Sequence, residues 1–148
     1  VGIKPDLGAP GASVSATVGT GNGTAAFGGT SGAAPVVTGS AALLLQAEPS
    51  LQVHEVKARL MGAANNVVQT NAAAAPGVLA PITRIGAGEV RVDRAVDLRT
   101  AMWDASLPGA TSLSFGYQPA TSSRVLRKRV VVRNYANVAR TYTIAPSF

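Results

Sequence analysis

The pattern of hydrophobic and polar positions divides the chain into stretches of different composition. Residues 1–30 are rich in Gly, Thr and Ser and are typical of loops and turns. From Gly32 through Leu45 apolar residues are so dense that no polar face is apparent, which predicts a helix buried on nearly all sides. Its most apolar part, 33–47, is shorter than the ~20 residues that a membrane span needs. We therefore expect a core helix rather than a membrane anchor.

A second, amphipathic helix is predicted after the break at residues 48–50. Ser50 is placed to cap this helix by accepting a hydrogen bond from a first-turn amide. Glu55 and Arg59 stand four residues apart, so we expect them to pair on one face. The apolar residues that recur at helical spacing, and that should form another face, are Val53, Val56, Leu60 and Ala63.

Turn-forming residues mark the connections. The dipeptide Asn22-Gly23 predicts a turn with positive φ, and with Thr24 it also forms a glycosylation sequon, a tripeptide that is common by chance. Residues 69–81 are rich in Ala and Pro without a polar face and are expected to form a surface loop. Residues 85–98 should form a short turn or strand that leads into a small helix.

Beyond Trp103 the chain has the pattern of antiparallel β structure, with short runs separated by turn residues. We expect residues 134–137 to turn the chain back, so that Tyr142 and Ile144 rejoin an apolar face. Lys128 interrupts the alternation that precedes this turn. The residues expected inside are Leu126, Val130 and Val132, and those expected in solvent are Arg127, Arg129 and Arg133.

Composition sets outer limits on function. The 148 residues are enough for about one domain, with a formal net charge of +6 and a pI of about 10.5. Such a balance would suit an anionic partner, or it is simply a solvated basic face. The absence of cysteine excludes a disulfide framework and a thiolate metal site. The sequence opens without methionine or an apolar leader, so we expect a piece of a longer chain.

The stretch GTSGAAPVVTG, residues 29–39, carries the candidate chemistry. Ser31 would lie in the first turn of the helix, where free amides and the helix dipole point at developing negative charge. Pro35 is tolerated in a first turn because its missing amide would not have been bonded. A serine here is either a nucleophile or a plain helix cap, and spacing alone does not decide. The small neighbours that would leave room for a substrate backbone are Gly28, Gly29, Gly32, Ala33 and Ala34.

Four segments in order resemble the subtilisin-like serine peptidases, or subtilases. GTSGAAPVVTGSAALLL is similar to their serine motif, Gly-Thr-Ser-x-Ala-x-Pro followed by a buried helix. KPDLGAPGASVSA, residues 4–16, resembles the stretch that precedes that motif. PSLQVHEVKARLMGAA resembles the following helix, and GAGEVRVDRAV, residues 86–96, resembles the closing element. Together they cover roughly residues 2–98.

The resemblance implies an α/β fold in two parts. Residues 1–107 would be the C-terminal part of a subtilisin-like catalytic domain, a three-layer domain built on a parallel sheet. Residues 108–148 resemble the start of a fibronectin-III-like domain. They would supply only the first strands of that antiparallel β-sandwich, which uses roughly seven.

The resemblance also implies an activity. Ser31 falls at the nucleophile of a Ser-His-Asp triad that hydrolyses peptide bonds, and Thr30 and Gly29 would lie beside the oxyanion and the substrate. No cofactor and no metal site are expected. The expected partners are a protein or peptide substrate and the rest of the parent catalytic domain, with no nucleic acid. The family resemblance places the protein outside the cell or at its surface.

The sequence departs from the family pattern in several places. Gly32 stands where the family commonly has Met, and Val36 where it often has His. The triad Asp and His and the oxyanion Asn lie upstream in the family, whereas 30 residues precede Ser31 here. We therefore expect those groups elsewhere in a parent chain, and no activity from this fragment alone. His54 is expected to face solvent, and Asp6 to hold the loop before the serine.

Other functions remain open at this level. The chain could come from a non-catalytic relative, or it could contribute only packing to a larger fold. A basic binding module for a polyanion is a further alternative, although a base-stacking platform is lacking. The basic residues that such a module would use are Arg124, Arg127, Lys128, Arg129, Arg133 and Arg140.

Overall fold

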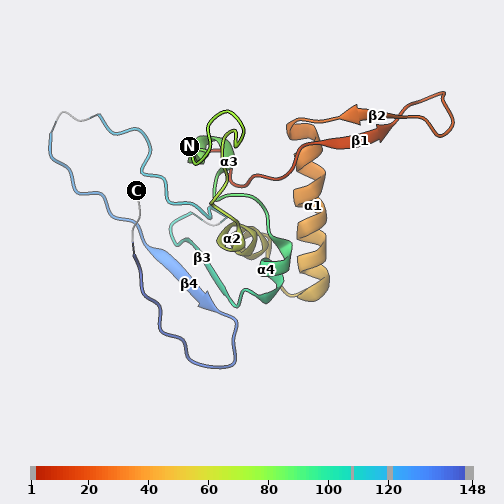
Figure 1. Cartoon of the computed structure of the whole chain (residues 1–148). Coiled ribbons are helices and arrows are strands. Elements are labelled where there is room, and N and C mark those ends of the chain that lie inside the picture. Colours follow the sequence, from red (N-terminus) through yellow and green to blue (C-terminus); the bar gives the residue numbers. More distant parts are fainter. Residues whose placement is uncertain (1–2, 108, 120–121, 146–148) are drawn as a thin grey trace.

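The computed structural model describes residues 3–107, 109–119 and 122–145 (Figure 1). Within them a β-hairpin is followed by the helices and then by a second strand pair. The strands are β1 (Ser13–Ala16), β2 (Thr24–Phe27), β3 (Thr100–Asp104) and β4 (Val130–Asn134), and the helices are α1 (Thr30–Ala47), α2 (Val53–Ala63), α3 (Ile82–Ile85) and α4 (Val92–Asp97). None of the helices in this described part is long and apolar enough to cross a membrane.

The hydrophobic core lies where α1, α2 and α4 meet (Figure 1). In the cartoon, α2 occupies the middle of the molecule, with α1 and α4 on one side and β3 on the other. Burial of apolar side chains between the helices stabilises this unit. The buried members of the core are Leu44, Leu51, Val56, Leu60, Ala63 and Ala95.

Helix α1 contains the predicted stretch 32–45 and extends it to Thr30 and Ala47, but it is much less buried than its composition suggests. Leu44 is fully enclosed, whereas its neighbours Leu43 and Leu45 are 53% and 39% exposed. Gly32 and Ser40 are the other buried residues of the helix. The prediction of a helix buried all round is therefore wrong for this chain. The physical reason is that α2 and α4 pack along one side of α1 and leave its other apolar side open.

The start of α2 differs from the prediction. Gln52, not Ser50, is the N-cap residue, and its backbone N–H donates to Glu55 Oε2 at 2.8 Å. This is the carboxylate half of a capping box, which a Glu at the third helical position supplies. Val53 is 89% exposed, so it does not belong to the core face. The expected pair between Glu55 and Arg59 is also absent, because each binds other partners.

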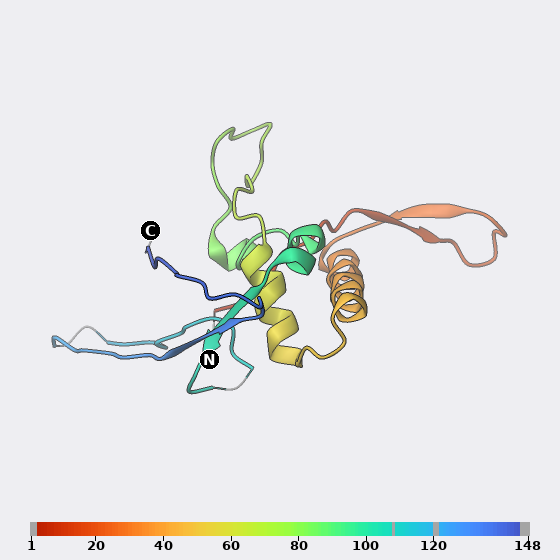
Figure 2. The same cartoon turned by 90° about the horizontal axis from the view of Figure 1, so that it is seen from below.

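The β1–β2 hairpin extends away from the helices (Figures 1 and 2). Its register runs from Ser13 opposite Phe27 to Ala16 opposite Thr24, and every strand residue is exposed. The sequence predicted positive φ at Asn22-Gly23. The structure has it instead at Gly19 and Gly21 of the connecting turn. Glycine has no Cβ to clash in that conformation, so the chain places these two residues there.

Strands β3 and β4 pair antiparallel, with Met102 opposite Val132 and Trp103 opposite Val131. Val131 is the half-buried position of β4, while Val130 and Val132 are 45% and 40% exposed. The alternation predicted that Val130 and Val132 are buried, and this prediction is wrong, because the covered side of β4 is the one that carries Val131. The predicted apolar set does share a face, because Val130 and Val132 line one hollow with Met102, Tyr142 and Ile144. Leu126, expected inside, is 46% exposed.

Two connections match their predictions. Residues 69–81 form a surface loop closed by a bridge between Gln69 and Leu79, and residues 86–91 lead into the small helix α4. The strands of the described residues form two antiparallel pairs, with one isolated parallel bridge between Gly8 and Glu89. Helices combined with small antiparallel sheets are compatible with part of a subtilase. A three-layer parallel sheet and a β-sandwich stay predictions.

Candidate functional site

Ser31 is the second residue of α1, at the end of the helix that the β1–β2 hairpin reaches (Figure 1). Its side chain is exposed, and among the described residues its hydroxyl makes no hydrogen bond. The amides of Gly32 and Ala33 both donate to the carbonyl of Gly29, at 3.0 and 3.2 Å. Gly29, the N-cap residue, has a φ of 89° and provides no side-chain cap. The hydroxyl therefore faces solvent beside the positive end of a helix dipole.

Three glycines bring the loop before the hairpin against the first turn of α1. A Cβ at Gly11 would lie 2.5 Å from the Gly29 carbonyl oxygen, and one at Gly32 would lie 2.4 Å from the Gly11 carbonyl oxygen. Both distances are too short for any side chain. Gly32 therefore permits a backbone contact that a side chain at this position would obstruct. Gly11 went unnoticed in the sequence because its contact partners lie eighteen or more residues away.

Pro35 lies in the second turn of α1, not in the first turn as predicted, because the helix begins at Thr30. Proline has no amide to donate to the carbonyl four residues earlier, which here belongs to Ser31. The Ser31 carbonyl therefore lacks its helical donor. Val36, on the next position, is 41% exposed.

Asp6 holds the loop before the serine to the rest of the chain. Its carboxylate pairs with Lys4 and with Lys57 of α2, the latter at 2.9 Å, and its carbonyl accepts from the Ala87 amide at 3.0 Å. Partial burial raises the pKa of Asp6, but hydrogen bonds and charges from the two lysines outweigh it and lower the pKa overall. This geometry matches the structural part expected for Asp6.

The prediction that His54 faces solvent is wrong. It is half-buried, and its ring packs edge-on against Trp103 of β3, with 4.9 Å between ring centroids and an interplanar angle of 74°. An edge-to-face aromatic contact of this kind favours a fixed ring position. No hydrogen bond joins His54 to Ser31 in the described residues. The structure therefore does not bring the one histidine of the sequence to the candidate nucleophile.

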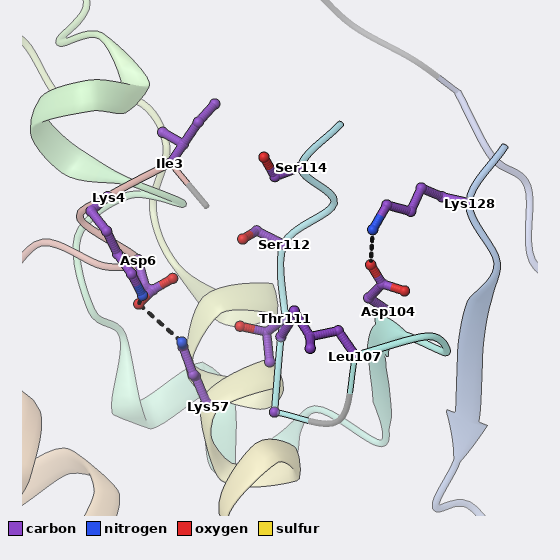
Figure 3. Close-up of a pocket in the computed structure, with 12 residues that line it drawn as sticks. Ile3, Lys4, Asp6, Lys57, Asp104, Leu107, Thr111, Ser112, Ser114 and Lys128 are labelled. Atoms are coloured by element: carbon purple, nitrogen blue, oxygen red, sulfur yellow. Dashed lines mark hydrogen bonds and ion pairs between the residues drawn. The ribbon is translucent and has the colours of Figure 1, made fainter. Parts of the chain in front are cut away.

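A pocket of about 520 Å³ lies between the loop around Asp6, α2 and the segment that follows β3 (Figure 3). Two lysine–carboxylate pairs flank it: Lys57 with Asp6, and Lys128 with Asp104 at 2.6 Å. Lys4 also lines the pocket and shares Asp6 with Lys57, so three lysines meet two carboxylates and the lining carries one excess positive charge. Ser31 does not line it.

Asp104 is the buried member of the second pair, with 2% of its surface exposed. A hydrogen bond from Lys128, together with bonds from the Ser106 hydroxyl and amide, lowers the pKa of Asp104 to about 2. Lys128 interrupts the strand alternation because its side chain reaches Asp104. Its role is to neutralise this carboxylate.

We expect the Asp104 carboxylate to make the fold sensitive to acid below pH 4. Its folded pKa is below its ordinary value, so the stabilisation is complete above that value and is lost as the pH falls through about 2. The midpoint of urea unfolding, measured from pH 6 to pH 2, should fall less steeply below pH 4 in Asp104→Asn. Asp97→Asn, at an exposed carboxylate, should keep the parent slope. Parallel profiles for parent and Asp104→Asn would contradict this assignment.

The C-terminal basic residues do not form a continuous free patch. Lys128 pairs with Asp104, and Arg133 pairs with Glu55 of α2. Arg133 was expected in solvent and is instead an ion-pair partner, although its side chain is 55% exposed. The remaining basic residues of the predicted cluster are exposed: Arg124, Arg127, Arg129 and Arg140.

Comparison with known proteins agrees with this geometry. The model of the subtilase family matches residues 1–88, a stretch that includes Ser31, Asp6 and the glycines around them. Because this is more than half of the 148 residues, the chain belongs to the subtilase family of serine peptidases.

Over nearly its whole length the chain is also similar to the minor extracellular protease Vpr of Bacillus subtilis (strain 168). The identity is 28% over 152 aligned residues, which cover 99% of this chain and 18% of the relative. The chain therefore spans about a fifth of that protein's length. The family match ends at residue 88, so a fibronectin-III-like identity for 108–148 stays a prediction.

Proposed function

We propose that this chain is the nucleophile-bearing part of a secreted subtilisin-type serine endopeptidase, with Ser31 as the nucleophile. The observation that carries the proposal is an exposed serine in the first turn of α1, within the family-matched residues, whose hydroxyl makes no hydrogen bond in the part of the chain that the structure describes. A serine in this place needs no movement of a cap or core to reach a substrate carbonyl. The extracellular location follows the relative, which is named an extracellular protease.

The first turn of α1 would supply part of the oxyanion stabilisation. Backbone N–H groups at the start of a helix lack intrahelical acceptors, and those of Thr30 and Ser31 lie there. Gly29 and Thr30 would lie against the substrate backbone, where the absence of a Cβ at Gly29 leaves room for close approach. Both assignments rest on the proposed position of the reacting carbonyl.

The general base would come from the parent catalytic domain. His54 is packed against Trp103 and Asp6 is bound by two lysines, so neither is free to serve Ser31. One side of α1 carries Val36 and Leu43, about 20° apart around the helix and both exposed. We infer that the rest of the parent domain, with its parallel sheet, covers this side and completes the triad. The strands after residue 108 would likewise belong to a larger sandwich.

The 148-residue chain alone should hydrolyse no peptide at a measurable rate. A serine without a general base has no route to the alkoxide at neutral pH. Incubation with fluorogenic peptides of varied sequence would measure this directly. Turnover that disappears in Ser31→Ala would contradict the proposal that the base lies elsewhere.

A further inference from the structure

Helix α2 carries two charged side chains that are almost completely enclosed. Glu55 is 1% exposed and Arg59 is 0% exposed, in a chain whose apolar core is small. Taking a charge out of water is unfavourable unless it is paired and hydrogen-bonded. The partners of these two groups therefore show which parts of the chain must be in place together.

Arg59 binds the helical half of the chain. Its Nη2 donates to the carbonyls of Ala95 and Val96, both at 2.9 Å, in the last turn of α4. Its Nη1 pairs at 2.5 Å with Glu48, the residue that ends α1. A cation at a helix C-terminus is favourable because the last carbonyls there lack helical donors. Arg59 thus joins the ends of α1 and α4 to α2.

Glu55 binds the C-terminal half. Its Oε1 accepts a 2.6 Å hydrogen bond from the Tyr135 hydroxyl and pairs with the Arg133 guanidinium. Within the described residues, Arg133 is the cation that pairs with this carboxylate. Without residues 133–135, the Glu55 carboxylate would keep, of its hydrogen bonds among the described residues, the one from the Gln52 amide.

Tyr135 connects the two charges. The guanidinium carbons of Arg59 and Arg133 lie 5.5 and 4.8 Å from its ring centre, so the ring contacts two cations. The Tyr135 amide donates to the Arg99 carbonyl at 2.9 Å, and the Arg99 side chain reaches Glu48 at 3.3 Å. Burial and the neighbouring Glu55 carboxylate raise the pKa of the Tyr135 hydroxyl, which keeps it a donor.

We propose that the Glu55–Arg59 surface of α2 is an intramolecular docking site for the cationic and phenolic residues 133–135. In this arrangement helices α1, α2 and α4 and the β3–β4 pair unfold as one cooperative unit. This goes beyond the proposed protease function and does not depend on it. A strand that belonged to an independent module would leave the buried charges of α2 satisfied without it.

The test uses thermal unfolding of the 148-residue chain, followed by two probes. Trp103 is the single tryptophan, lies in β3 and packs on His54 of α2, so its fluorescence reports the strand pair together with that contact, while far-ultraviolet circular dichroism reports helix content. Both signals should change at the same temperature. Tyr135→Phe should lower that temperature by about 3 to 10 °C, because it removes a hydrogen bond to a charged acceptor.

Tyr142→Phe is the matched control. It removes a hydroxyl that contacts Thr100 Oγ1 at 2.9 Å at an exposed position, and it should shift the midpoint by less than about 2 °C. In a cycle with Glu55→Gln, the double variant should lose less than the sum of the single losses. Arg133→Gln replaces Glu55→Gln in the cycle if the latter does not fold. Equal shifts for the two tyrosine variants, additive losses, or separate transitions for the two probes would each overturn the proposal.

Discussion

Ser31→Ala in the parent protease should lower kcat for peptide hydrolysis by roughly 10⁴- to 10⁶-fold. The substitution removes the atom that would form the acyl-enzyme, and what remains is substrate binding with oxyanion stabilisation. The fold should be unaffected to within about 0.5 kcal/mol, since the exposed hydroxyl makes no hydrogen bond among the described residues and no core volume changes. Initial rates on a protein substrate and the unfolding midpoint would be measured together.

Ser50→Ala is a suitable control, because Ser50 is an exposed serine near the other end of α1 and does not cap α2. It should leave both the rate and the midpoint unchanged. Labelling by a serine-directed phosphonate adds a second readout and should be lost in Ser31→Ala alone. Hydrolysis that persists in Ser31→Ala at the parent rate would exclude Ser31 as the nucleophile.

Gly88→Ala should lower the free energy of unfolding by about 3 kcal/mol or more. Gly88 has a φ of 129°, a conformation that L side chains rarely adopt, and a Cβ there would lie 2.3 Å from the Asn65 carbonyl oxygen. Its own carbonyl accepts from the Gly8 amide at 2.8 Å, so a shift of this backbone would also move the loop before the serine. Urea unfolding of the 148-residue chain would measure the loss.

Gly77→Ala is the control that separates the cost of a positive φ from the cost of the steric contact with Asn65. Gly77 also has a positive φ, 81°, but a Cβ there meets nothing within 4 Å. It should therefore cost only the conformational part, about 1 kcal/mol. Equal losses for the two variants would show that the Asn65 contact does not constrain Gly88.

The sequence was informative wherever structure depends on neighbouring residues. The start of α1 beside Ser31 and the loop at 69–81 follow from glycine, proline and hydroxyl residues within a few positions, and both predictions are confirmed. The cap of α2 is equally local but was assigned to Ser50. Glu55 indicates Gln52 as the N-cap residue, because the carboxylate of a capping box stands three residues after the N-cap residue and accepts a hydrogen bond from its amide.

The failures concern partners that are distant along the chain. Glu55 and Arg59 have the spacing of a solvent-exposed pair, yet each is buried by groups that the pattern does not reveal. The residues that bind Glu55 lie 78 and 80 positions away. Hydrophobic periodicity likewise grouped Val130 with Val132 correctly, but it cannot indicate whether anything covers their face. Both cases require tertiary contacts that local propensity does not encode.

The loop contacts near Ser31 are another case in which the sequence does not reveal tertiary partners. Gly11, Gly29 and Gly32 look like ordinary small residues in the sequence, and the structure shows them in backbone contact. Such contacts are invisible to composition because every loop is rich in glycine. These contacts constrain the first turn of α1 through the loop that precedes the hairpin.

That loop also sets the order in which the site is assembled. The bridges of Leu7 with Gly86 and of Gly8 with Glu89 join segments about eighty residues apart, whereas the contacts of Arg59 span 11 to 37 residues. Closing the longer span is slower because more chain entropy is lost before any contact forms. On the ribosome, at roughly 5 to 20 residues per second, residues 86–89 follow residues 7 and 8 by of order 10 s. The loop before the hairpin is therefore held against residues 86–89 only after the helices that carry Ser31 and Arg59 have been synthesised.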